Sequence, residues 1–510
     1  MTGGVIQSID YAAVAAPLVL ALVAGLVLLL DAFLPARPGG ARVLGLVTLG
    51  GLVAALAVVA VQAVGGGTRR TFCVPASLGG EPARPAAPAS CSFVVDRFSL
   101  VIAAVVLAAG VVVVLLSMTE IAAGRDAGPG ERSRIPAGEW YFLLSATLAG
   151  AVLLPASRDL IMLVVSLELV SLPVFALTAL RRHDGRASEA ALKLFLVSVV
   201  STAITLFGVS LLYGVTGSAH LDRIDAALRT AGDMAQVTAA AIVLVVAGFA
   251  FKIAAVPFHS WAGDVYQGAP IPVAALLSVV SKASGFAGLI LLLTSALPTK
   301  AALWAPGVAV VAALTMTAGN VLAMRQRAAV RLLAWSSVAQ SGYILAPLAV
   351  YAVEPRAAVG ASVAYLVFYA AMNLIAFAVV LLVARLPEGH DLEAYRGLAL
   401  RSPAAGLSLA FALVCLAGLP PGLAGLFAKV VIFRAVVDGG LGWLALVMAA
   451  NTVAGLYYYI AWTARLFAPP AAGESRTVST RAAAGVAVAV TVAVTVVFSV
   501  APQVVLSVSG

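Results

Sequence analysis

Lysine is rare in this sequence, and most of its lysines lie in apolar stretches. The chain has five lysines and 26 arginines. Lys300 lies in a predicted loop, and the other four lie in stretches apolar enough to cross a membrane: Lys193, Lys252, Lys282 and Lys429. A guanidinium stays protonated, whereas burial can move the pKa of an amine by about 3 to 5 units. Because ionisable groups inside a membrane usually mark ion or proton paths, these four lysines are predicted to carry protons.

One carboxylate accompanies the lysines. Glu168, in "LIMLVVSLELVSLPVF", lies at the centre of an uninterrupted apolar stretch. A lone buried carboxyl must be protonated or paired with a cation, so we expect a lysine as its partner. Such a pair would hold the lysine proton while closed and release it when opened. The alternatives are permanent ion pairs or lysines that extend to the membrane surface. An ion pair is a specific alternative for Lys193, because Glu189 precedes it at i, i+4 spacing.

Two of the lysines lie beside prolines that break a helix. In "FKIAAVPFHSW" (251–261), Pro257 stands between Lys252 and His259, and in "GLPPGLAGLFAK" (418–429) a Pro-Pro pair precedes Lys429. Proline removes a helical hydrogen bond, and lipid cannot satisfy the freed backbone groups, so each break must face protein or water. Pro257 is therefore predicted to let water and side chains reach Lys252. His259, with an unperturbed pKa near 6.5, is either a proton relay or a hydrogen-bonding cap.

The elements that position these residues are predicted to be membrane-spanning helices. The sequence is 62% hydrophobic and 10% charged, with a mean hydropathy of +1.08, whereas soluble domains are about 25% charged. Its apolar stretches reach the roughly 20 residues of a spanning helix, not the roughly 10 of a barrel strand. The fold class is therefore all-α and polytopic. The fourteen predicted spans are 10–33, 41–65, 95–118, 138–155, 159–180, 188–214, 236–256, 270–294, 303–324, 328–349, 357–384, 404–434, 441–464 and 482–500.

The two breaks fall in the seventh and twelfth spans, five spans apart. An odd number of crossings reverses the starting side, so spans 4 to 8 and 9 to 13 are predicted to form two inverted five-helix repeats. Broken helices at corresponding points of two halves are typical of a transport site. The predicted organisation is an N-terminal three-helix segment with a long outside loop (1–137), a first repeat (138–294), a second repeat (295–467) and a C-terminal helix (468–510).

Arginines concentrate in the loops that follow odd-numbered spans, as at Arg325 and Arg327. The positive-inside rule then places these loops in the cytoplasm and both termini outside. This topology accounts for the net charge of +9, so no nucleic-acid partner is predicted. Asp10 stands where the basic region of a signal peptide would be, so the first span is expected to remain in the protein.

The cysteines predict no cofactor site. Cys73 and Cys91 share the long outside loop, and the sequence leaves open whether they form a disulfide there. Cys415 lies within a span and is expected to pack in the core. No CxxC, HExxH or strand-linked GxGxxG motif occurs, so no metal, redox cofactor or dinucleotide is predicted in this chain.

Long strings of the sequence resemble the antiporter-like membrane subunits of the proton-pumping NADH-quinone oxidoreductase, respiratory complex I, and among them the subunit N family. The resemblance covers nearly the whole chain. Lys429 fits subunit N better than subunit M, which carries a glutamate there. The strings are "ELVSLPVFAL" (168–177), "ALKLFLVSVVSTAITLFGVSLLYGVTGS" (191–218), "FKIAAVPFHSWAGDVYQGAPIPVAALLSVVSKASGF" (251–286), "RLLAWSSVAQSGY" (331–343) and "GLPPGLAGLFAKVVIF" (418–433).

The resemblance implies two inverted half-channels and a buried series of charged residues across the membrane. By motif position its members are Glu168, Lys193, Lys252, Lys282 and the exit-side Lys429. It also implies a bacterial inner membrane and, as partners, the other membrane and peripheral subunits of complex I, including neighbouring antiporter-like subunits. NADH, FMN, iron-sulfur clusters and quinone would bind in those partners and not in this chain.

Gln340 departs from the family pattern, because relatives often carry histidine at this position. Glutamine cannot hold a titrating proton near neutral pH. A proton relay at this point would have to use water or hydroxyl groups, or does not exist here.

The predicted function is a non-redox, proton-translocating subunit of an NADH:quinone oxidoreductase, coupled to quinone reduction elsewhere in the complex. One alternative is a subunit of a multisubunit cation/proton antiporter, which would share the fold and the buried lysines. Another is a structural membrane subunit whose lysines form ion pairs and transport nothing.

Overall fold

The computed structural model describes residues 9–33, 39–74, 90–126, 135–181, 184–229, 234–386, 389–470 and 482–509. All fourteen predicted spans are helical in these ranges. Twelve described helices are long and apolar enough to cross a membrane. The remaining two predicted spans consist of shorter helical pieces, since one is broken and the other ends in a 3-10 turn. The prediction of an all-α polytopic fold is confirmed.

The described first half of the chain contains two short helices that lie outside the predicted spans, α7 (Leu221–Leu228) and α9 (Trp261–Gly268). The bounds in this half are α1 (Ala15–Phe33), α2 (Gly40–Gly65), α3 (Arg97–Asp126), α4 (Ala137–Leu153), α5 (Leu160–Ala179), α6 (Gly185–Thr216), α8 (Ala235–Lys252), α9 (Trp261–Gly268), α10 (Ile271–Leu276) and α11 (Lys282–Leu291).

In the second half, two described short helices lie outside the predicted spans. Helix α15 (Leu398–Arg401) lies between the eleventh and twelfth spans, and α20 (Gln503–Ser509) follows the last span. The other bounds are α12 (Ala301–Ala323), α13 (Ala329–Leu345), α14 (Pro355–Val383), α16 (Pro403–Ala417), α17 (Leu423–Asp438), α18 (Gly442–Phe467) and α19 (Ala482–Val500).

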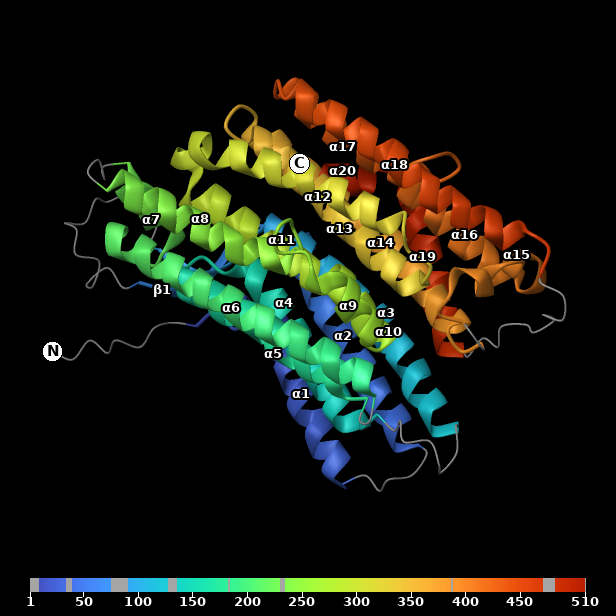
Figure 1. Cartoon of the computed structure of the whole chain (residues 1–510). Coiled ribbons are helices and arrows are strands. Elements are labelled where there is room, and N and C mark those ends of the chain that lie inside the picture. Colours follow the sequence, from blue (N-terminus) through green and yellow to red (C-terminus); the bar gives the residue numbers. More distant parts are fainter. Residues whose placement is uncertain are drawn as a thin grey trace.

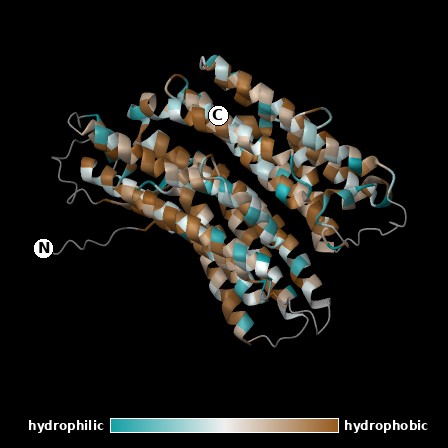
Figure 2. Ribbon diagram, in the orientation of Figure 1, coloured by the Kyte–Doolittle hydropathy of each residue, from teal (hydrophilic) through white to brown (hydrophobic). Residues whose placement is uncertain are grey.

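The bundle is apolar both inside and on its lateral surface. Hydrophobic residues cover most of the helices, and hydrophilic residues gather mainly toward helix ends and loops (Figure 2). Large apolar side chains remain exposed on outer helices, as at Leu22 (64%), Phe207 (59%) and Val453 (67%). A soluble protein would bury such side chains, whereas lipid solvates them.

Two helices form the centre of the molecule. Helix α14 is buried over nearly its whole apolar length. It contacts α3, α10, α13, α16, α17 and α19. The stretch Ile271–Ala296 is likewise buried throughout its most apolar part. In Figure 1, α6, α8 and α9 lie on one side of this centre and α12, α16 and α18 lie on the other.

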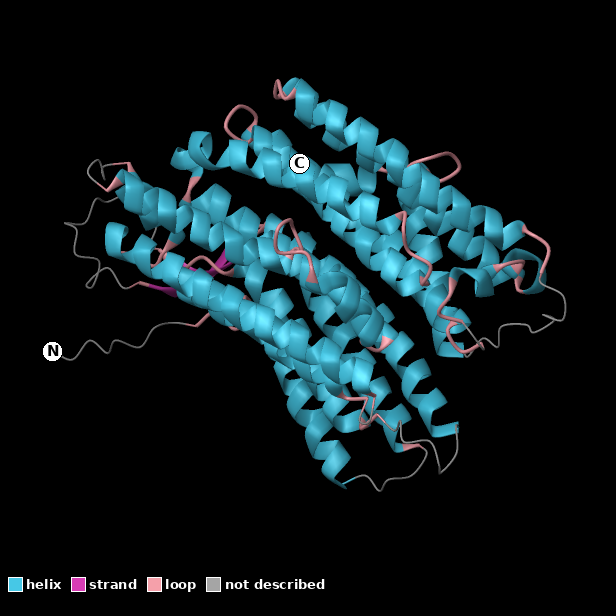
Figure 3. Ribbon diagram, in the orientation of Figure 1, coloured by secondary structure: helices cyan, strands magenta, loops and turns pink. Residues whose placement is uncertain are grey.

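The loop between α2 and α3 contains a β-hairpin that the sequence analysis did not predict (Figure 3). Strands β1 (Arg69–Cys73) and β2 (Cys91–Val95) pair antiparallel, with Cys73 opposite Cys91. These two residues form a disulfide, which answers the question that the sequence left open. The tip of the loop, 75–89, lies outside the described residues. Cys415 is buried, as expected.

The seventh predicted span is broken, and its helix is shorter than the predicted 236–256. Helix α8 ends at Lys252, and α9 begins at Trp261. The freed backbone groups find hydroxyl partners, because Ser341 Oγ donates to the Ile253 carbonyl (2.7 Å) and the Val256 amide donates to Thr315 Oγ1 (2.9 Å). This satisfies the requirement that non-helical backbone at membrane depth must contact polar groups of the protein.

The twelfth predicted span, 404–434, is two helices. Helix α16 ends at Ala417, and α17 begins at Leu423. Gly418 ends α16 in a left-handed conformation (φ +79°), which glycine adopts without steric cost. The Ala424 amide at the start of α17 donates to Ser499 Oγ of α19 (3.1 Å). The prediction of broken helices seven and twelve is confirmed, and the inverted relation between the repeats stays a prediction.

Candidate functional site

Three of the four predicted lysines are buried inside the bundle. Lys282 is 1% exposed, and Lys252 and Lys429 are each 8% exposed. Within the described residues, none of these three lysines has a carboxylate at ion-pair distance, and each amine donates to neutral oxygens. A positive charge held only by neutral dipoles in a low-dielectric interior costs free energy. Each amine is therefore placed where its protonation state can respond to nearby charge.

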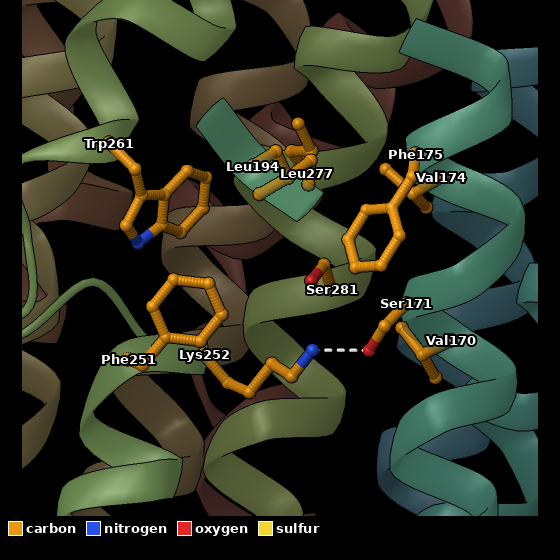
Figure 4. Close-up of a pocket in the computed structure, with 10 residues that line it drawn as sticks. All are labelled: Val170, Ser171, Val174, Phe175, Leu194, Phe251, Lys252, Trp261, Leu277 and Ser281. Carbon is orange, nitrogen blue, oxygen red and sulfur yellow. Dashed lines mark hydrogen bonds between the residues drawn. The ribbon is translucent and has the colours of Figure 1, made fainter. Parts of the chain in front are cut away.

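Lys252 projects from the end of α8 into a small cavity between α5, α6 and the π-helical turn Leu277–Ser281 (Figure 4). Its Nζ donates to Ser171 Oγ of α5 and to Ser198 Oγ of α6 (3.3 Å). The cavity is about 20 Å³ and is also lined by Ser281, the residue before Lys282. A volume of this size holds about one water. The cavity is therefore lined by Lys252 and by the residue that precedes Lys282.

Glu168 does not pair with a lysine, which corrects the expected ion pair. Its Oε1 accepts a hydrogen bond from Thr202 Oγ1 of α6 (2.6 Å), and no ion pair joins it to a lysine in the part of the chain that the structure describes. The carboxylate still interacts electrostatically with Lys252. The carboxylate is thus held by a hydroxyl group and not by an ammonium.

Lys193 is not buried, contrary to the expectation drawn from the family resemblance. Its side chain is 44% exposed and forms ion pairs with Glu189 (2.7 Å) and Asp264 (2.9 Å). Asp264, on α9, also pairs with Arg331 of α13 (3.1 Å). The i, i+4 pair considered from the sequence is present, and the bridge between α6 and α9 through Asp264 could not be read from local spacing.

Lys282 lies at the centre of a hydroxyl-rich cluster. Its Nζ donates to the Ser337 carbonyl (2.5 Å) and to Ser337 Oγ (2.6 Å), and Tyr369 Oη donates to the same hydroxyl (2.8 Å). The residue follows a π-helical turn, Leu277–Ser281, that joins α10 to α11. Such turns are frequent at functional sites because the extra residue turns side chains away from the regular helical positions. The sequence pattern contains no signal for this turn.

Lys429 reaches back from α17 to the second break. Its Nζ donates to the Ala417 carbonyl (2.5 Å), one of the groups left free at the end of α16, and lies 5.9 Å from the centre of the Tyr343 ring. A Cβ at Gly418 would come 2.8 Å from Lys429 Cδ. Glycine at this position therefore makes room for the lysine side chain as well as for the turn.

A row of polar side chains, made of serine and tyrosine hydroxyls and the amide of Gln340, lies between Lys282 and Lys429. The sequence analysis singled out only Gln340. Tyr365 Oη donates to Gln340 Oε1 (2.6 Å), and Gln340 Nε2 donates to Tyr459 Oη (3.2 Å). Tyr459 Oη is 2.5 Å from Ser336 Oγ, next to the serine that holds Lys282. The Tyr365 ring stacks on Tyr343, beside Lys429. Gln340 thus orients two tyrosine hydroxyls, as a relay without histidine would require.

His259 lies in the first break and is half-buried. Its ring packs against Trp335 with 5.9 Å between centroids, and its Nδ1 has no hydrogen-bond partner among the described residues. Its carbonyl accepts from the Ala262 amide at the start of α9. The backbone thus supports the capping interpretation, and the role of the imidazole as a relay stays a prediction.

The fold and these contacts define a polytopic helical membrane protein that holds ionisable side chains inside its bundle, between two broken helices. No group of three or more His, Cys, Asp or Glu side chains that could hold a metal ion occurs within the described ranges. The site thus consists of buried amines, hydroxyl groups that contact them and a water-sized cavity beside Lys252.

The chain belongs to the family described as "NADH:quinone oxidoreductase/Mrp antiporter, TM", whose model matches residues 157–455. It is 51% identical over 483 residues to "NADH-quinone oxidoreductase subunit N 2" of Streptomyces griseus, covering 93% of this chain and 86% of that protein. It is 45% identical over 475 residues to "NADH-quinone oxidoreductase subunit N" of Salinispora tropica, covering 91% and 86%. The predicted resemblance to the antiporter-like subunits, and to subunit N among them, is confirmed.

Solved structures agree with this assignment. A chain in "Respiratory complex I from Thermus thermophilus with bound Aureothin" matches with a TM-score of 0.75 and 30% identity, covering 96% of this chain and 98% of that chain. A chain of "Structure of Mrp complex from Dietzia sp. DQ12-45-1b" matches with a TM-score of 0.77 but 22% identity, covering 96% and 95%. The second likeness concerns the fold alone.

Proposed function

We propose that this chain is the proton-translocating subunit N of an NADH-quinone oxidoreductase. The observation that carries the proposal is the set of three buried lysines that have no carboxylate at ion-pair distance in the described ranges, separated by hydroxyl groups. The names of the relatives support the assembly, because the subunits N from Streptomyces griseus and Salinispora tropica resemble this chain over nearly its whole length. NADH, FMN, iron-sulfur clusters and quinone are assigned to other subunits of the complex.

The proposed path begins at the exposed ion-pair network of Lys193 and passes to Lys252. Glu168 sets the charge beside Lys252, because its carboxylate acts on that amine electrostatically. When Glu168 moves from Thr202 toward Lys252 the amine holds its proton, and when it returns the amine releases it. Ser281 then links the cavity of Lys252 to the adjacent Lys282.

The second part of the proposed path runs from Lys282 to Lys429. Ser336 and Ser337 are consecutive on α13, so the serine that holds Lys282 is next to the one that contacts Tyr459. The tyrosine hydroxyls that Gln340 orients continue toward Lys429. Hydroxyls and water carry the proton in this part, because the amide does not titrate.

The predicted division of the chain becomes part of this proposal. Residues 138–294 and 295–467 would form the two inverted repeats, each with one broken helix, flanked by residues 1–137 and 468–510. Both termini would face outside. The disulfide of the hairpin supports this orientation, because disulfides persist in oxidising compartments.

The alternative with a specific observation in its favour is a cation/proton antiporter subunit. The structural likeness to a chain of the Mrp complex supports the shared fold. Sodium-dependent proton flux in the absence of NADH would favour the antiporter, whereas proton flux that requires NADH and quinone favours the first function.

The substitution Lys252→Ala in the assembled complex tests the proposed function. We expect normal assembly, because loss of a buried charge that has no carboxylate partner leaves no opposite charge unpaired. Proton pumping into vesicles, followed with a pH-sensitive dye during NADH oxidation, should be strongly reduced. Glu168→Gln should act in the same direction.

The matched control is Arg434→Ala, which removes an exposed cation paired only with Asp438 one turn away on α17. Such pairs contribute about 0.3–0.5 kcal/mol, so assembly and pumping should both be unchanged. Near-normal pumping by a correctly assembled Lys252→Ala complex would rule out the proposed path.

A further inference from the structure

An apolar groove of about 430 Å³ separates α8 from α12 on the side of the bundle. Its lining runs along α8 from Ala239 to Ala250 and along α12 from Leu303 to Val311. The groove is open laterally, because Leu303 is 52% exposed and a Cβ at Gly307 would meet no heavy atom within 4 Å. A lateral opening in a spanning helix pair faces the bilayer or another subunit.

The depth of the groove matches one leaflet. The lining residues of α8 run from Ala239 to Ala250, eleven helical steps, which is about 16 Å at the helical rise of about 1.5 Å per residue. Half of the hydrocarbon core of a bilayer is about 15 Å. Val256, Pro257 and Phe258 of the first break close the inner end. The groove therefore fits a chain that enters from one membrane surface and stops near the midplane, and it is too short for a helix that crosses the bilayer.

The outer end of the groove carries the features of a membrane surface. Trp304 lines the groove near the start of α12, and its Nε1 donates to the Leu297 carbonyl (3.0 Å). Lys300 precedes Trp304 by one helical turn and forms no ion pair with any residue that the structure describes. The nearby carboxylate of Asp225 is already paired with Arg229 (2.7 Å). Lys300 thus supplies a cation without an ion-pair partner among the described residues, four residues before the groove-lining Trp304.

We infer that this groove binds one acyl chain of a bilayer phospholipid, with the phosphate of its headgroup beside Lys300. The apolar lining packs against the methylene groups as neighbouring lipid tails do. The ammonium of Lys300 attracts the phosphate. The match of depth, lining and charge selects a lipid over a polar ligand.

The lipid has a direct structural effect on the proton path. Its chain end lies against Val256, Pro257 and Phe258, the segment that follows Lys252. This segment is not helical. It is held by one hydrogen bond to Ser341, one to Thr315 and a few local backbone hydrogen bonds. A bound acyl chain therefore packs the lipid-facing side of the break and limits its motion.

A photoreactive phosphatidylglycerol tests this inference in the intact complex. One probe carries a diazirine at the end of an acyl chain, and a second carries it next to the glycerol. After illumination and digestion, the chain-end probe should label residues 253–258, and the glycerol-side probe should label residues 303–307. The measurement requires no proton pumping, so its outcome is independent of the proposed function.

The variant Gly307→Phe should fill the groove and abolish labelling of residues 253–258 by the chain-end probe. Gly50→Phe on α2 is the matched control, because Gly50 also lies in a spanning helix with open space around it, and it should leave this labelling unchanged. Lys300→Gln should reduce labelling by the glycerol-side probe.

Three outcomes would overturn the inference. The first is equal labelling of all lipid-facing helices by both probes, and the second is unchanged labelling in an assembled Gly307→Phe complex. The third is a crosslink from the groove to another subunit, which would make the groove a protein interface.

Discussion

The hydrogen-bond partners of the buried lysines explain how a charge can be both tolerated and movable. Serine hydroxyls and backbone carbonyls accept from an ammonium, and the hydroxyls can also donate to a neutral amine. Lys252 and Lys282 each contact at least one serine hydroxyl. A carboxylate in direct contact would instead fix the protonated form. The neutral partners therefore suit an amine whose protonation state changes.

The hydroxyl of Tyr365 provides a test of the second part of the path. Tyr365→Phe removes the group that donates to Gln340 and leaves the ring stacked on Tyr343. The loss of one such hydrogen bond inside a membrane protein costs only about 0.6 kcal/mol on average, so assembly should be retained. NADH-driven proton pumping should fall, because the row between Lys282 and Lys429 loses a hydroxyl.

The control is Tyr395→Phe. Tyr395 is fully buried, and its hydroxyl has no hydrogen-bond partner among the described residues. Equal effects of the two substitutions on pumping would show that the Tyr365 hydroxyl has no specific part in the path.

At the level of elements, the two breaks place their lysines differently. Lys252 is the last residue of the helix before the first break, whereas Lys429 lies seven residues after Gly422, beyond the second break, and reaches back to it. In the first break, serine and threonine hydroxyls satisfy freed backbone groups, and in the second, the lysine itself satisfies a freed carbonyl. Moving Lys429 therefore also changes the hydrogen bonding of a helix end.

Gly418→Ala tests this coupling between helix end and lysine. An alanine at φ +79° costs roughly 1–2 kcal/mol in backbone strain, and its Cβ would displace the Lys429 side chain. We expect a moderate loss of thermal stability and a clear loss of proton pumping.

Gly440→Ala is the control for backbone strain, because Gly440 has φ +81° and a Cβ there would meet no heavy atom within 4 Å. It should lower stability by a similar amount and leave pumping unchanged. If both variants lost pumping equally, the contact with Lys429 would not be the cause.

The helices could be predicted from the sequence because each apolar stretch has the length of a membrane span. The burial of Lys252, Lys282 and Lys429 could be predicted because each of them lies within an apolar stretch of span length. The π-helical turn before Lys282 could not be predicted, because its residues are as apolar as those of a regular helix. The exposure of Lys193 and the partners of Glu168 depend on side chains more than thirty residues away, which local spacing does not encode.

At the scale of the whole molecule, the disulfide hairpin reports the orientation of the chain in the membrane. Cys73 and Cys91 are joined in the loop between α2 and α3, and Cys415 is buried in α16. If this loop faces outside, a membrane-impermeant reductant followed by an impermeant maleimide should label Cys73 and Cys91 in spheroplasts. Mass spectrometry of the peptides from this chain provides the measurement.

The same reagents should not label these cysteines in sealed inverted vesicles, and Cys415 should stay unlabelled in both preparations. Labelling of Cys73 and Cys91 only in inverted vesicles would reverse the proposed topology.

The amide of Gln340 has a consequence for the resting complex. An imidazole between Tyr365 and Tyr459 could take up a proton on one nitrogen and give one up from the other, at rest as well as during turnover. The amide cannot do so, and its oxygen and nitrogen hold the two hydroxyls in fixed directions. We therefore expect the idle complex to be poorly permeable to protons at this point, so that the stored membrane potential does not dissipate through Gln340.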